Sequence, residues 1–90
     1  MMTAETIKYE LEGRVLDLGE SVGKRHVSVR WEPAPRIVRV GLMIEHYDWD
    51  NRMEAIRLLR SFERAHVDEF AVEYDIVPLE AVTNEAYAEA

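Results

Sequence analysis

The segment from Glu45 to Asp50, which reads EHYDWD, carries the residue types of this chain that are best suited to chemistry. Carboxylates beside an imidazole could bind a divalent cation, or form the acidic site of a small enzyme. The spacing matches neither an EF-hand loop nor an H-E-x-x-H motif. Asp48 and Asp50 also precede a helical pattern, where aspartate caps the first turn and complements the helix dipole. Capping is therefore the favoured interpretation, and the sequence predicts no metal ion and no cofactor.

A second candidate is the polar face of a helix expected over residues 51–65. Its arginines recur at helical spacing beside a methionine and near a tryptophan. These residue types are enriched at protein interfaces, and Trp and Arg dominate binding hot spots. We therefore expect a partner-binding surface made of Trp49, Met53, Arg57, Arg60 and Arg64. The alternative is a solvated helix face with Trp49 folded back onto the core.

The distribution of charge suggests a different surface. Residues 1–64 hold eleven basic and eleven acidic side chains, whereas residues 65–90 hold seven acidic side chains and no Lys or Arg. The acidic side chains of the last expected strand and the turn before it are Asp68, Glu69, Glu73 and Asp75. Arranged as one stripe, they could imitate nucleic-acid phosphates and inhibit a nucleic-acid-handling complex, by analogy with anti-restriction and anti-CRISPR inhibitors. The acidic tail could instead fold over the arginines and neutralise them.

Composition limits the class of protein. Ninety residues with 48% hydrophobic side chains predict one globular domain over residues 1–90, in which residues 79–90 form an acidic tail or short helix. The chain has no cysteine, which excludes a disulfide framework. A net charge of −7 disfavours direct binding of nucleic acid. The N-terminus lacks the features of a signal peptide, and no apolar run approaches the about 18 residues of a membrane span. We therefore expect a cytoplasmic protein.

Hydrophobic periodicity predicts the elements that position these residues. A period of two predicts strands over residues 7–15, with a bulge near Gly13, and over residues 27–31, 37–45 and 70–76. A helical period predicts one helix over residues 51–65. The order β-β-β-α-β predicts an α+β, two-layer domain, with a four-stranded mixed sheet and one helix packed on one face. We expect the last strand to lie beside the first, in the order 4-1-2-3.

Alternation also predicts the core and the uncovered face of the sheet. Ile37 and Met43 are apolar residues on the otherwise polar face, which favours self-association into a homodimer. Tyr9 is expected to point into the core. The other side chains predicted to be buried are Val29, Trp31, Val40, Leu42, Phe62, Val72 and Tyr74.

These observations favour a small non-catalytic module that binds another protein or a second copy of itself. No pair of acid and base groups and no activated nucleophile stands out, so the sequence predicts that the protein is not an enzyme. The acidic mimic of nucleic acid is the first alternative. A small enzyme with an acidic site near residues 45–50 is the second.

Overall fold

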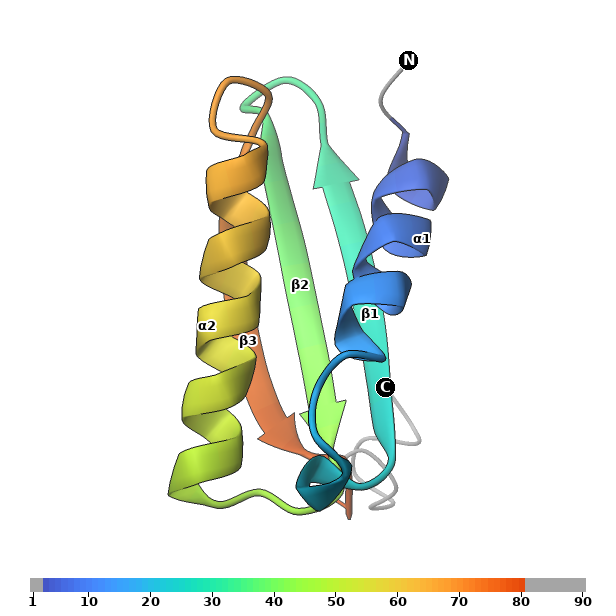
Figure 1. Ribbon diagram of the computed structural model, residues 1–90. Helices are drawn as coiled ribbons and strands as arrows, with labels where there is room; N and C mark the ends of the chain where they lie inside the picture. Colours follow the sequence, from blue (N-terminus) through green and yellow to red (C-terminus); the bar gives the residue numbers. More distant parts are fainter. Residues whose placement is uncertain (1–2, 81–90) are drawn as a thin grey trace.

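The computed structural model describes residues 3–80 and has the element order α1–η1–β1–β2–α2–β3 (Figure 1). The elements are helix α1 (Ala4–Val15), the 3-10 turn η1 (Glu20–Val22), strands β1 (Arg25–Glu32) and β2 (Ile37–Ile44), helix α2 (Trp49–Ala65) and strand β3 (Ala71–Pro78). The fold class is α+β, as predicted. Within residues 3–80, however, the sheet has three strands rather than four, and there are two helices rather than one. Most of the predicted tail, residues 81–90, lies outside the described residues.

The sheet has the order β1-β2-β3, with β2 in the centre. β1 and β2 form an antiparallel hairpin, and α2 carries the chain back so that β3 runs parallel to β2. Both helices pack against the same face of the sheet (Figure 1). The expected order 4-1-2-3 was wrong because the first predicted strand is a helix, so the last strand pairs with β2 instead.

Helix α1 replaces the strand predicted over residues 7–15. A capping box starts it: the Thr6 backbone N–H donates to the Thr3 hydroxyl, and the Thr3 backbone N–H donates to the Thr6 hydroxyl. The buried face of the helix is formed by Ile7, Leu11 and Val15, which are four residues apart. Tyr9, expected in the core, is 82% exposed on the opposite side.

The core lies between the two helices and the sheet. Of the side chains predicted to be buried, Val40, Leu42, Phe62 and Val72 are confirmed. The other three are half-buried and pack against the edge of the core: Val29, Trp31 and Tyr74.

The open face of the sheet is polar, with a network of ion pairs across all three strands. Arg39 on β2 donates from Nε to Glu32 on β1 at 3.1 Å, and it also pairs with Glu73 on β3. Ile37 is half-buried, and Met43 is only 8% exposed within the single chain. Met43 therefore offers little exposed area to a second copy, and self-association of the chain stays a prediction. Among residues 3–80, neither helix combines the length and the apolar composition that crossing a membrane requires.

Candidate partner-binding surface

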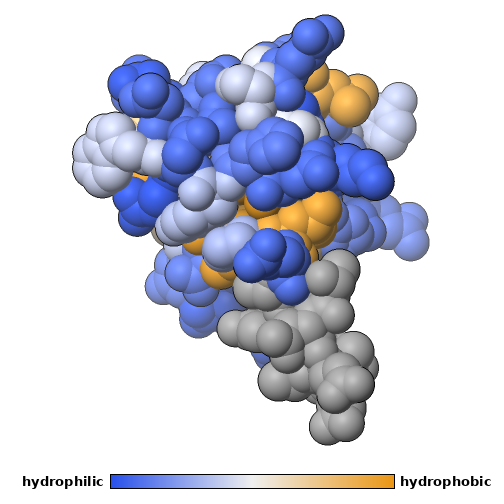
Figure 2. Space-filling view, turned by 90° about the horizontal axis from the view of Figure 1, so that it is seen from below, coloured by the Kyte–Doolittle hydropathy of each residue, from blue (hydrophilic) through white to orange (hydrophobic). Residues whose placement is uncertain are grey.

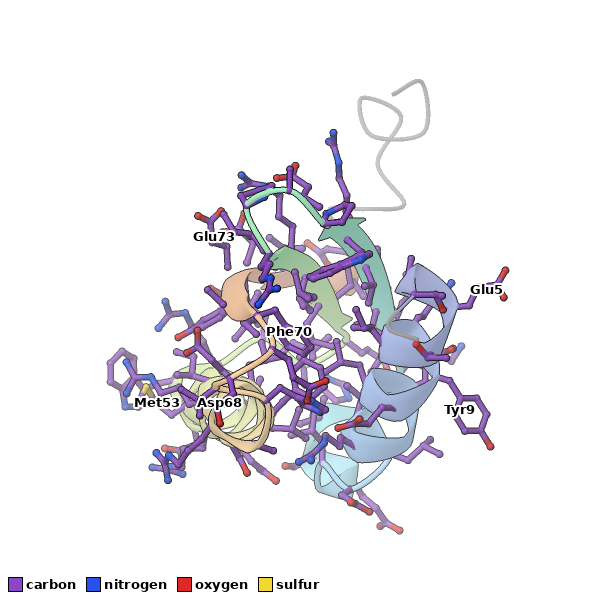
Figure 3. The ribbon with its side chains drawn as sticks, turned by 90° about the horizontal axis from the view of Figure 1, so that it is seen from above. Glu5, Tyr9, Met53, Asp68, Phe70 and Glu73 are labelled. Atoms are coloured by element: carbon purple, nitrogen blue, oxygen red, sulfur yellow. The ribbon has the colours of Figure 1, made fainter. Side chains whose placement is uncertain are left out.

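The predicted partner-binding residues lie along the outer side of α2, and we call them the arginine surface: Trp49, Met53, Arg57, Arg60 and Arg64. Asp48 caps the helix, since its side chain accepts a hydrogen bond from the Asn51 backbone N–H at 2.8 Å. This cap places Trp49 in the first turn, where it is 70% exposed rather than folded onto the core. Met53 lies on the side of α2 away from α1, whose Tyr9 marks the opposite flank of the molecule (Figure 3), but it is half-buried because it also packs against the core.

The three arginines of this surface are exposed, and none of them forms an ion pair within residues 3–80. The acidic residues of α2 that could neutralise them are used elsewhere. Glu54 accepts the Gly19 backbone N–H at 3.0 Å, and Glu63 accepts the Val72 backbone N–H at 2.8 Å. Both carboxylates therefore join α2 to other parts of the fold instead of forming ion pairs with the arginines of the same helix. The guanidinium groups remain available to a binding partner.

A surface depression of about 660 Å³ lies at the C-terminal end of α2 and extends the arginine surface. Arg60 and Arg64 line it, together with Arg36 from the turn between β1 and β2. Arg36 has a φ of 57°, in the left-handed region, and its carbonyl accepts the Ala71 backbone N–H at 2.9 Å. Arg36 was not predicted to belong to the partner-binding surface, because no local pattern shows that the hairpin turn meets the end of α2.

Charge, rather than one continuous apolar area, distinguishes this part of the molecule. The large apolar side chains that are exposed within residues 3–80 are dispersed over several elements: Tyr9, Leu16, Tyr47, Trp49 and Val67. Seen from below, the surface is mostly hydrophilic, with an apolar area near its middle (Figure 2).

The four residues of the alternative acidic surface do not form one stripe. Asp68 and Glu69 lie in the turn after α2, whereas Glu73 and Asp75 lie on β3 and face the open side of the sheet; Figure 3 shows Asp68 and Glu73 well apart. Two of the four are paired within the chain. Glu69 contacts His66 Nδ1 at 2.6 Å, and Glu73 pairs with Arg39.

The segment from Glu45 to Asp50 has a structural role. Glu45 accepts the Lys24 backbone N–H at 2.9 Å, and this hydrogen bond holds the pKa of its carboxyl below the usual value. The next residue along, Asn51, is 4% exposed and donates to the carbonyl oxygen of His46 at 3.0 Å. In residues 3–80, no group of three or more His, Asp or Glu side chains is placed to hold a metal ion. The capping interpretation of Asp48 is confirmed.

No sequence pattern predicted the cluster around His66. Both ring nitrogens contact carboxylates, Nε2 that of Glu10 on α1 and Nδ1 that of Glu69. The imidazole also stacks on Phe70, with ring centroids 4.9 Å apart. The cluster joins α1 to the end of α2, and no signal in the sequence links residues so far apart.

Comparisons of the chain with protein-family models, with curated proteins and with solved structures found no match.

Proposed function

We propose that this protein is a small non-catalytic binding module that docks onto a partner protein through the arginine surface. The observation that carries this proposal is that the arginines along α2 are unpaired within the described part of the chain, while the glutamates of the same helix are engaged elsewhere. Arg57, Arg60 and Arg64 are exposed without an ion pair in residues 3–80, while Glu54 and Glu63 on the same helix are held by backbone N–H groups.

Such a surface is suited to binding. A guanidinium forms strong bidentate hydrogen bonds with carboxylates, and an exposed tryptophan supplies apolar contact area. The rest of the chain brings the net charge to −7, so the arginines form a local positive region on an acidic protein. That contrast favours one orientation of an approaching partner over others.

The test is capture of the partner from native host extract on the immobilised full chain, followed by calorimetry with the purified partner. We expect the double variant Arg57→Glu/Arg60→Glu to bind about tenfold or more weakly, because exposed hot-spot charges are reversed. The matched variant Glu73→Gln/Asp75→Asn should bind like the wild type.

Loss of binding in the Glu73→Gln/Asp75→Asn variant alone would instead support the acidic mimic. Wild-type binding by both variants would contradict both proposals. Sedimentation of the purified chain shows whether the partner is a second copy of this chain or a different protein. A self-associating module would sediment as a dimer without any other protein.

A further inference from the structure

We infer that the partner inserts an acidic and apolar peptide segment, in which carboxylates alternate with aliphatic side chains, into the depression where Arg36, Arg60 and Arg64 meet. This inference rests on the proposed function and names the chemistry that the arginine surface recognises. The proposed peptide site also includes Arg36, which lies in the turn between β1 and β2 and is not part of the arginine surface.

The three guanidinium groups come from two elements that the fold holds together. Arg60 and Arg64 lie one turn apart on α2, and Arg36 lies in the turn between β1 and β2. The backbone of Arg36 is anchored on both sides, since its N–H donates to Pro33 and its carbonyl accepts from Ala71 at 2.9 Å. Within residues 3–80, none of the three forms an ion pair. The backbone positions of the three arginines are therefore fixed before a ligand binds, which lowers the cost of binding.

The remaining lining favours a peptide over a phosphate group or a nucleic acid. Pro35, Val67 and Phe70 supply apolar walls, and Val67 is 70% exposed. Three carboxylates also line the depression: Glu63, which accepts the Val72 backbone N–H, and the exposed Asp68 and Glu69. They would repel a dianionic phosphate more strongly than a single carboxylate. A volume of about 660 Å³ accommodates a few side chains.

The probe is a short fluorescein-labelled peptide of alternating leucine and glutamate, and its binding to the full chain is followed by fluorescence anisotropy. Matched peptides carry glutamine or phosphoserine in place of glutamate. We expect the glutamate peptide to bind, the glutamine peptide to bind about tenfold or more weakly, and added salt to weaken the interaction. The phosphoserine peptide should bind no more tightly than the glutamate peptide.

Two variants test the depression itself. Arg36→Asn removes the cation and keeps a residue type that tolerates a left-handed backbone. Arg64→Gln removes a second cation at a helical position, so its effect on binding involves no left-handed residue. Each should weaken binding of the glutamate peptide about tenfold, whereas Arg30→Gln, an exposed arginine on the open face of the sheet, should change it less than about twofold. Circular dichroism confirms that each variant is folded.

The inference is overturned if the glutamate peptide does not bind, if the glutamine peptide binds equally well, or if the phosphoserine peptide binds more tightly. Failure of the inference can be distinguished from failure of the proposed function by comparing Arg36→Asn with Arg57→Glu against the captured partner. If Arg57→Glu loses the partner and Arg36→Asn keeps it, the arginine surface docks the partner and the depression does not.

Discussion

His66 Nε2 lies 2.8 Å from the nearer carboxylate oxygen of Glu10, a residue 56 positions earlier in the chain. The other ring nitrogen, Nδ1, lies 2.6 Å from the carboxylate of Glu69. Ionised carboxylates accept hydrogen bonds and cannot donate them, so carboxylates at both ring nitrogens favour the doubly protonated, positively charged imidazole. This contact joins the end of α2 to α1, the helix that was predicted as a strand.

The stability of the domain should fall as the pH rises through the titration of His66. Burial opposes the charged imidazole, but hydrogen bonds to Glu10 and Glu69 outweigh it and raise the pKa of His66 above its ordinary value of 6.5. Burial also opposes the charged Glu10, but hydrogen bonds from His66 and Arg14 lower its pKa below 4.5. The His66 contribution is complete below about pH 6.5 and is lost above the raised pKa, while the Glu10 contribution is lost toward acid pH.

Urea unfolding at about pH 6 and about pH 8.5 measures this effect. The midpoint of the wild type should be lower at the higher pH, and His66→Gln should remove most of the difference. His26→Gln, an exposed change on the open face of the sheet, should leave the difference intact. A His66→Gln protein with the full wild-type pH dependence would contradict the assignment.

Leu42→Ala should destabilise the domain by about 2–5 kcal/mol, because it leaves a cavity in the core where the central strand β2 packs against the helices. Leu42 is fully buried beneath both helices, at 0% exposure. Leu42→Met, which nearly conserves the volume, should cost less than about 1.5 kcal/mol. Leu16→Ala removes the same atoms from a side chain that is 76% exposed, and it should change the free energy of unfolding by less than about 0.5 kcal/mol. Chemical denaturation of the three variants tests this ranking, and equal losses for Leu42→Ala and Leu16→Ala would show that the register of β2 is wrong.

Arg25→Lys should destabilise the domain by about 1–3 kcal/mol although it conserves the charge. The Arg25 guanidinium donates to the carbonyl oxygens of Val15 at 2.9 Å and Leu18 at 2.7 Å, and also to two glycine carbonyls. It thereby joins the end of α1 and the following loop to the start of β1, and a lysine ammonium cannot reach all of these acceptors. Thermal unfolding measures the loss, with the exposed neighbour Lys24→Gln as control; similar melting temperatures for the wild type and Arg25→Lys would contradict this role.

Reversing the charge of Arg57 and Arg60 should leave the melting temperature nearly unchanged. Both side chains are exposed and form no ion pair in residues 3–80, so the change in the free energy of unfolding should stay within about 0.5 kcal/mol for each. Calorimetry checks this, and a strong loss of stability would mean that these arginines belong to the fold rather than to a binding surface.

Local patterns were sufficient for four of the elements within residues 3–80. In β2, apolar residues at every second position from Val38 to Ile44 fit a strand whose one face is buried. In α2, the cap at Asp48 and the helical spacing up to Phe62 fit an amphipathic helix. The same patterns were ambiguous for α1. Ile7, Leu11 and Val15 are separated by four residues, which fits a period of two as well as a period of about 3.6, so the pattern alone could not decide.

The candidate site, too, was predictable from the sequence only in part. The spacing of Arg57, Arg60 and Arg64 places them on one face of any helix, so the sequence by itself determined that they lie together. It could not determine that Glu54 and Glu63 turn to backbone N–H groups, or that Arg36 joins Arg60 and Arg64. Arg36 lies beside Arg60 and Arg64 because β3 pairs with β2, which brings the hairpin turn to the end of α2, and the Glu63 contact is with β3 itself. The Glu54 contact depends instead on the loop after α1 packing against α2. Such long-range packing depends on the whole chain, and only the tertiary structure decides it.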